Sequence, residues 1–266
     1  MDWWWAYLAL GAFVGFFSGL LGVGGGSAIV PILTFIFAGK ALAPNHVVHL
    51  ALGTAMATVL FTSASSVISH HRRRAVNWGI LRNMVPGVLV GTFSGALIAS
   101  YLNTLFLGIL FAVVVFFSAT QLLLEIKPKA TRALPGTAGL WLVGGTIGAL
   151  SSLAALAGAS LMVPFLVSRN VRIHEAIGTA AAVGWPLALA GTAGYVLSGV
   201  GTPGLPEHSV GFVYLPAVLW IVFASVIMAP LGARVAHRTQ GRTLRRVFAF
   251  VLYALATKMV WSLLHR

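Results

Sequence analysis

The sequence predicts an all-α integral membrane protein built from two inverted repeats of four hydrophobic segments each. Three observations support this prediction: the composition, an internal repeat and the distribution of the basic residues. Apolar residues make up 59% of the 266-residue chain and charged residues only 8%, far below the roughly 25% of a soluble domain. Because no charge-rich stretch is long enough for an extramembrane domain, we expect nearly all of the chain to lie in the membrane.

Eight hydrophobic blocks follow one another along the chain. Most are 20–26 residues long, which suits tilted helices that cross a hydrocarbon core about 30 Å thick. The first and the fifth blocks are longer, and small residues interrupt each of them ahead of a proline. The blocks lie at residues 3–38, 46–69, 79–101, 104–124, 137–168, 174–199, 211–236 and 243–264.

The first block contains the glycine-rich stretch Gly22–Ser27, followed by Pro31. Each glycine destabilises a helix by about 1 kcal/mol relative to alanine, and proline removes a backbone donor. The pattern therefore predicts a helix, a break at Gly22–Ser27 and a second helix. Two interpretations stay open. The break is either a hinge for tight helix packing or a half-helix start that offers free N–H groups to a ligand at the bilayer midplane.

The fifth block repeats the pattern of the first. The matched pairs are Gly25 and Gly158, Ser27 and Ser160, and Pro31 and Pro164. Downstream, His49-Leu-Ala-Leu-Gly-Thr-Ala matches His174-Glu-Ala-Ile-Gly-Thr-Ala. An internal repeat of this kind is typical of transporters. It divides the chain into an N-terminal membrane repeat (1–126), a cytoplasmic linker (127–136) and a C-terminal membrane repeat (137–266).

The basic residues decide how the two halves are oriented. If every block crossed the membrane once, eight basic residues would face each side. If the two broken blocks are instead hairpins, fourteen face one side, Lys40 and Arg266 face the other, and Lys258 lies within a block. Only the second arrangement follows the positive-inside rule. It predicts that the first segment of each repeat is a broken helix hairpin and that both termini are periplasmic, in a bacterial inner membrane.

Several classes of function are disfavoured. The net charge of +13 comes from short loops between apolar runs, so we expect no nucleic-acid partner. The four acidic residues, Asp2, Glu125, Glu175 and Glu207, lie at the chain start or near loops. This position argues against a cation carrier with an intramembrane carboxylate, although a sodium site made of backbone carbonyls stays open.

We expect no cofactor, no metal and no enzymatic activity. The chain has no cysteine, and the pair His46 and His49 lacks a third ligand nearby. The stretch Gly91-Thr-Phe-Ser-Gly95 differs from the Gly-x-Ser-x-Gly nucleophile elbow.

Two motifs resemble those of a known family. The element Gly-Val-Gly-Gly-Gly-x-x-x-Val-Pro at residues 22–31 and its echo Ala-Gly-Ala-Ser-x-Met-Val-Pro at residues 157–164 look like the TauE/SafE sulfite exporter family. The resemblance extends over essentially the whole chain. It implies a bacterial inner-membrane carrier of sulfur-containing anions such as sulfite, sulfoacetate or other organosulfonates. In the second half, Ala157 and Ala159 stand opposite Gly24 and Gly26.

The candidate site follows if both breaks meet at the repeat interface. Free N–H groups and serine hydroxyls at two helix starts would then cradle a small oxyanion. The threonines of the Gly-Thr-Ala elements are further candidates, although a threonine hydroxyl can also bond its own i−4 carbonyl. His49 and His174 are either proton-coupling groups or interfacial residues at helix starts. The predicted substrate-binding residues are Gly24, Gly25, Gly26, Ser27, Thr54, Gly158, Ala159, Ser160 and Thr179.

The sequence therefore predicts a secondary transporter that exports a small sulfur-containing anion by alternating access. The alternative is an uptake carrier or a channel for a related small anion with the same fold. The expected partners are the anionic substrate and membrane lipid, and a homodimer stays open.

Overall fold

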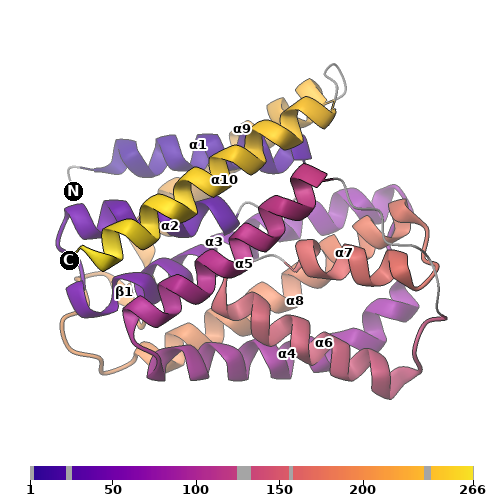
Figure 1. Ribbon diagram of the computed structural model, residues 1–266, viewed down its shortest axis with the longest axis horizontal. Helices are drawn as coiled ribbons and strands as arrows, with labels where there is room; N and C mark the ends of the chain where they lie inside the picture. Colours follow the sequence, from indigo (N-terminus) through magenta and orange to yellow (C-terminus); the bar gives the residue numbers. More distant parts are fainter. Residues whose placement is uncertain (1–2, 22–25, 125–132, 156–157, 237–240, 266) are drawn as a thin grey trace.

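The computed structural model describes residues 3–21, 26–124, 133–155, 158–236 and 241–265. Almost all of this chain is helical, and most of the helices run along the long axis of the molecule (Figure 1). The elements are α1 (Trp4–Leu21), α2 (Gly26–Gly39), the 3-10 turn η1 (Pro44–His46), α3 (Val47–Arg72), α4 (Trp78–Tyr101), α5 (Thr104–Leu124), α6 (Thr137–Leu153), α7 (Ala159–Ser168), α8 (Ile173–Gly199), β1 (Ser209–Val210), β2 (Val213–Tyr214), α9 (Leu215–Ala236) and α10 (Gly241–Leu264).

The helices agree with the predicted blocks. Among the described residues, six helices are long and apolar enough to cross a membrane: α3, α4, α5, α8, α9 and α10. The two long blocks are each divided into two helices, α1 with α2 and α6 with α7. Both divisions fall where glycine, alanine and proline predicted a break. The chain is therefore an all-α, multi-pass membrane protein.

One short stretch differs from the prediction. The block at residues 211–236 was expected to be helical throughout, but its first residues belong to a two-stranded antiparallel hairpin. Ser209 pairs with Tyr214 and Val210 pairs with Val213, and helix α9 begins only at Leu215. The hairpin contains the apolar residues Phe212 and Val213, which extended the apparent hydrophobic block.

Each broken segment begins and finishes at the same end of the molecule. The Lys40 ammonium, just after α2, lies 6.0 Å from the ring centroid of Trp3, just before α1. Arg169, just after α7, donates a 3.3 Å hydrogen bond to the carbonyl of Ala133, ahead of α6. Both helix pairs are therefore hairpins, as the distribution of basic residues predicted.

Helices at equivalent positions of the sequence repeat pack against each other in opposite directions. Helix α3 runs antiparallel to α8, and α5 runs antiparallel to α10. The residue pairs in contact are Gly53 with Tyr195 and Met56 with Gly191 for α3 and α8, and Gly108 with Leu263 and Thr120 with Tyr253 for α5 and α10.

The other extensive helix–helix contacts also join the first half of the chain to the second. Helix α1 packs along α9, and α4 packs along α6. A Cβ added at Gly15 would lie 2.5 Å from the Cα of Ser225, and one added at Gly91 would lie 2.0 Å from the carbonyl oxygen of Gly145. Glycine at such points lets two backbones approach closely, as is common between membrane helices. Helices of the first half of the sequence therefore pack directly against helices of the second half.

The molecule has two ends that differ in charge. The arginine end comprises residues 70–78 and 169–178, which are joined by a hydrogen bond from the Asn77 amide to Glu175. The terminus end comprises residues 40–46, 100–104 and 200–214, which meet around one cavity, and both chain termini lie on this side in Figure 1. Within these ranges the arginine end carries five arginines and the terminus end carries only Lys40.

Candidate transport site

The two breaks meet at the middle of the molecule. A Cβ added at Gly26, the first residue of α2, would lie 2.0 Å from the carbonyl oxygen of Ala155 and 3.4 Å from Cγ2 of Val59. A Cβ added at Gly158, just ahead of α7, would lie 3.2 Å from Cδ1 of Leu187. Val59 and Leu187 are close to the midpoints of α3 and α8. The start of α2 thus touches the second break halfway between the two ends.

The backbone of the second break is left-handed at two residues, a conformation that glycine adopts easily and other residues rarely adopt. Ala155 has φ 43° and Gly158 has φ 72°, and the left-handed region destabilises a non-glycine residue by about 1–2 kcal/mol. The Ala155 carbonyl lies against Gly26, where no side chain fits. This contact gives a packing reason for the unequal breaks, because glycine is needed at residue 26 whereas alanine stands at the equivalent residue 159.

The predicted serines occupy the second position of each half-helix. Ser27 is only 2% exposed, and Ser160 is half-buried. N–H groups in the first turn of a helix have no acceptor within that helix. Pro31 and Pro164 lack an N–H group, so the carbonyls of the two serines, four residues earlier, also lack their usual helical partner. Gly24, Gly25 and the side chain of Ala159 lie outside the described part of the chain.

Thr54 and Thr179 lie toward the two ends, away from the breaks. The Thr54 hydroxyl accepts a 3.0 Å hydrogen bond from the N–H of Tyr214. The Thr179 hydroxyl accepts a 2.9 Å hydrogen bond from the N–H of Asn77. Tyr214 directly precedes α9 and Asn77 directly precedes α4, so each threonine fixes the start of a helix from the other half of the chain.

The glycines beside these threonines make matching contacts. A Cβ added at Gly53 would lie 2.2 Å from the carbonyl oxygen of Phe212, and one added at Gly178 would lie 2.2 Å from the carbonyl oxygen of Ala75. We call Gly53, Thr54, Phe212 and Tyr214 the Thr54 clasp. We call Gly178, Thr179, Ala75 and Asn77 the Thr179 clasp. The first joins the two halves toward the terminus end, and the second joins them toward the arginine end.

The two candidate histidines lie far apart. His49 is 1% exposed, and its Nε2 lies 3.0 Å from the carbonyl oxygens of both Ala99 and Leu102, at the end of α4. His174 is exposed at the arginine end. His46 packs near His49, with 5.4 Å between the ring centroids. Among the described residues no group of three or more His, Cys, Asp or Glu could hold a metal ion.

Comparison with known proteins identifies the family. The family model described as "Sulfite exporter TauE/SafE" matches residues 7–259. The chain belongs to the TauE/SafE family. A "Probable membrane transporter protein" of Haemophilus influenzae is 34% identical over 253 residues, which cover 95% of this chain and 96% of that protein. A probable membrane transporter of Methanocaldococcus jannaschii is 23% identical over 251 residues, covering 92% of this chain and 91% of that protein.

A third relative agrees with this assignment. The "Probable membrane transporter protein YdhB" of Bacillus subtilis is 29% identical over 201 residues, which cover 70% of this chain and 76% of that protein. No solved structure matches the chain. The family and these relatives identify the TauE/SafE chain as a membrane transporter.

Sequence reasoning missed the partners of the two threonines. Asn77 and Tyr214 stand at equivalent positions of the repeat, because the offset that pairs Gly95 with Gly232 also pairs residue 77 with residue 214. Extending the repeat alignment into these connections would have singled them out. Asn77 carries a second local signal, since an asparagine ahead of a helix is a common N-cap. Its side chain accepts a 3.0 Å hydrogen bond from the N–H of Ile80.

Proposed function

We propose that this TauE/SafE protein is a secondary transporter that exports a small sulfur-containing anion, sulfite or an organosulfonate such as sulfoacetate, across the bacterial inner membrane. The observation that carries the proposal is the contact between Gly26 and Ala155 at mid-length of α3 and α8. The N-terminal end of a helix favours an anion through its dipole and its free N–H groups. Broken helices that meet at half depth are the usual substrate site of transporters built from inverted repeats.

The chemistry around the breaks favours an anion over a cation. Among the described residues, Glu175 lies in the first turn of α8 and Glu207 lies in an exposed loop, so neither is in the middle of a helix. The donors proposed for the anion are the neutral hydroxyls of Ser27 and Ser160 together with backbone N–H groups of Gly26 and of residues 158–160. Neutral donors bind an anion without trapping it, as a carrier requires.

An inside-negative membrane potential supports export. It drives an anion outward by about 2.3 kcal/mol per charge per 100 mV. We assign the arginine end to the cytoplasm and the terminus end to the periplasm, because the positive-inside rule puts arginine-rich loops in the cytoplasm. The antiparallel pairs α3 with α8 and α5 with α10 support the inverted arrangement of the two halves.

Alternating access then follows from the two clasps. The Thr179 clasp opens to admit the anion from the cytoplasm while the Thr54 clasp holds, and the order reverses for release. A threonine hydroxyl freed from its N–H partner can donate to the passing anion. His49 is the stronger candidate for proton coupling than His174, because its Nδ1 is buried without a partner among the described residues and His49 adjoins the Thr54 clasp.

Gly26→Ala and Gly39→Ala form a matched pair that tests the break. Both glycines belong to α2, but an added Cβ meets the Ala155 carbonyl at residue 26 and nothing within 4 Å at residue 39. We expect Gly26→Ala to lower exchange of labelled sulfoacetate or sulfite in proteoliposomes by about tenfold or more, since overpacking disturbs a site by about 1–3 kcal/mol. Gly39→Ala should leave exchange unchanged. Equal rates in the two variants would remove the break from the site.

The same proteoliposomes separate the alternatives. A carrier exchanges internal unlabelled anion for external labelled anion, whereas a channel shows net flux without this counterflow. A carrier that accumulates the anion on the cytoplasmic side under an inward gradient of a coupling ion would be an uptake system. Failure to exchange any of sulfite, thiosulfate, sulfoacetate and taurine, or exchange of lactate alone, would overturn the proposed substrate class.

A further inference from the structure

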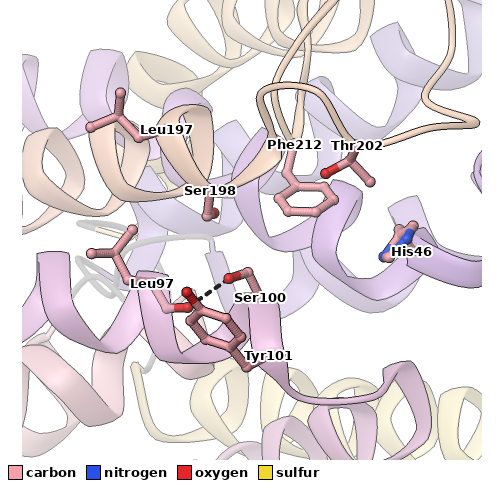
Figure 2. A pocket seen from close by; sticks show the side chains of 8 residues that line it. All are labelled: His46, Leu97, Ser100, Tyr101, Leu197, Ser198, Thr202 and Phe212. Carbon is pink, nitrogen blue, oxygen red and sulfur yellow. Dashed lines mark hydrogen bonds between the residues drawn. The ribbon is translucent and has the colours of Figure 1, made fainter.

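A cavity of about 430 Å³ lies at the terminus end, away from the breaks (Figure 2). It is formed by the last turns of α4 and α8, by η1 and by the hairpin segment at Phe212. Its volume lies within the range of roughly 300–1,000 Å³ that small-molecule sites occupy. The central site does not include any of its lining residues.

Two residues of the cavity lining each contain a buried polar atom without a hydrogen-bond partner among the described residues. These atoms are Nδ1 of His46 and Oγ of Ser198. A buried polar group without a hydrogen bond is unfavourable, so such groups usually have a partner. The His46 ring is held in position by Phe212 at 5.6 Å and His49 at 5.4 Å between centroids. Although His46 directly precedes α3, its side chain makes no capping bond to that helix.

Several carbonyl groups around the cavity already have donors. The Ser100 hydroxyl donates to the carbonyl of Leu97 at 2.7 Å, as the dashed line in Figure 2 marks. The N–H of Thr202 donates to the carbonyl of Gly199 at 3.2 Å, and the carbonyls at the end of α4 face Nε2 of His49. The polar groups left for a ligand are therefore the ring of His46 and the hydroxyls of Ser198, Thr202 and Tyr101.

These groups suit an organic oxyanion, with a charged head and an apolar part. His46, Ser198 and Thr202 can each donate a hydrogen bond, and none of the described lining residues is an Asp or Glu that would repel a negative charge. Leu97, Leu197 and Phe212 supply apolar walls. Hydrogen bonds to a charged acceptor are stronger than those between neutral groups.

We propose that this cavity is a second anion site, which takes a small organic anion, a sulfonate with a short aliphatic chain, on the outer side of the Thr54 clasp. The Phe212 carbonyl lies against Gly53, so the residue that lines the cavity also belongs to the clasp. The inference rests on the proposed function for its ligand: the exported anion occupies the cavity after the clasp opens and before release.

Cysteine protection tests this site directly, because the chain contains no cysteine. The variant Thr202→Cys puts a single thiol at the cavity of the full-length protein in detergent. We expect ethanesulfonate to slow its modification by 2-sulfonatoethyl methanethiosulfonate, and ethylammonium at the same concentration to have no such effect. Thr137→Cys, exposed at the start of α6, is the matched control and should show no protection.

Two further substitutions assign the protection to the proposed donors. On the Thr202→Cys background, His46→Phe, which keeps the aromatic packing, and Ser198→Ala should each raise the protecting ethanesulfonate concentration about tenfold, the expected result of losing one hydrogen bond to a charged group. Ser94→Ala is the matched control for the serine, because Ser94 donates to the Val90 carbonyl and does not line the cavity. If His46→Phe fails to fold, Ser198→Ala alone tests the assignment.

The possible outcomes are distinct. Lack of protection, equal protection by ethylammonium, or protection that neither substitution weakens would each overturn the outer site. Counterflow by the parent protein in proteoliposomes separates this failure from that of the proposed function. Intact exchange without protection eliminates the outer site alone, whereas protection without exchange keeps the site and refutes export.

Discussion

The two clasps make the same backbone contact but are completed by different side chains. At the Thr54 clasp the ring of Tyr214 packs against Phe37 at 5.7 Å and Tyr7 at 6.3 Å between centroids. At the Thr179 clasp the amide of Asn77 donates to the carboxylate of Glu175. The terminus end is thus closed by aromatic packing, and the arginine end by a charge-assisted hydrogen bond.

This difference teaches how one repeated element can serve two sides of a membrane. The shared glycine and threonine set the geometry, and the side chains around them set how readily each end opens. Burial raises the pKa of the Tyr214 hydroxyl, so this group stays neutral and the Thr54 clasp contains no charge. The contacts of both clasps are formed in this structure, so a substitution that weakens one should bias the protein toward opening at that end.

The largest expected effect comes from the clasp glycines. Gly53→Ala and Gly178→Ala each put a Cβ 2.2 Å from a carbonyl oxygen, which forces the backbones apart. We expect each to lower the free energy of unfolding by about 1–3 kcal/mol and to abolish most anion exchange. Thermal unfolding in detergent and proteoliposome counterflow measure the two effects. Gly39→Ala serves as the control, and clearly unequal losses would show that the clasps are not equivalent.

The clasp threonines should separate the two ends. Thr54→Val and Thr179→Val each leave one backbone N–H without its acceptor, a loss of about 1–3 kcal/mol when the group stays buried. We expect the smaller loss for Thr179→Val, because Glu175 still holds Asn77. Thr→Ser at either position keeps the hydroxyl and should restore stability.

The rate of thiol modification shows which end of the protein each threonine substitution opens. Modification of a Ser27→Cys thiol, which is only 2% exposed at the central break, by a reagent added at the terminus end should be faster in Thr54→Val and unchanged in Thr179→Val. Acceleration by both substitutions alike would mean that the clasps open together, which contradicts alternating access.

Much of this architecture is readable from the sequence because the signals are local. The block at residues 46–69 became α3 (Val47–Arg72), and the block at residues 79–101 became α4 (Trp78–Tyr101). Hydropathy over one helix length fixes such segments, and glycine with proline marks the breaks. The hairpins were predicted from the basic residues, which can be counted loop by loop along the sequence.

The clasps could not be read in this way. Gly-Thr-Ala is compatible with ligand lining or with an i−4 hydrogen bond, and Thr58 does bond the carbonyl of Thr54 at 2.9 Å. The hydrogen bond from the Tyr214 N–H to the Thr54 hydroxyl joins residues 160 positions apart. It therefore depends on which helices pack together in the fold. The outer cavity was missed because the residues that form it are widely separated in the sequence.

Glu175→Gln should weaken only the arginine end. The substitution removes the charge that strengthens the hydrogen bond from Asn77, and we expect a loss of about 0.5–1.5 kcal/mol. High salt should weaken this contact in the parent but not the uncharged contact in the variant, so the difference in unfolding temperature should shrink as salt rises. Glu207→Gln, in an exposed loop, should have no effect. If Glu207→Gln lowered the stability as much as Glu175→Gln, the effect would come from the change in net charge alone.

The smallest effect is expected from one hydroxyl at the terminus end. The Tyr7 hydroxyl is buried without a partner among the described residues, whereas its ring packs against Phe37 and Tyr214. Tyr7→Phe removes the unpaired oxygen and keeps the packing, so we expect stabilisation of about 1 kcal/mol or less. Tyr195→Phe is the matched control, because that hydroxyl donates to the carbonyl of Ser152 at 2.9 Å, and its loss should destabilise the protein. If Tyr7→Phe instead slows anion exchange without lowering stability, the Tyr7 hydroxyl acts on the anion at the Thr54 clasp, and the terminus end is not closed by apolar packing alone.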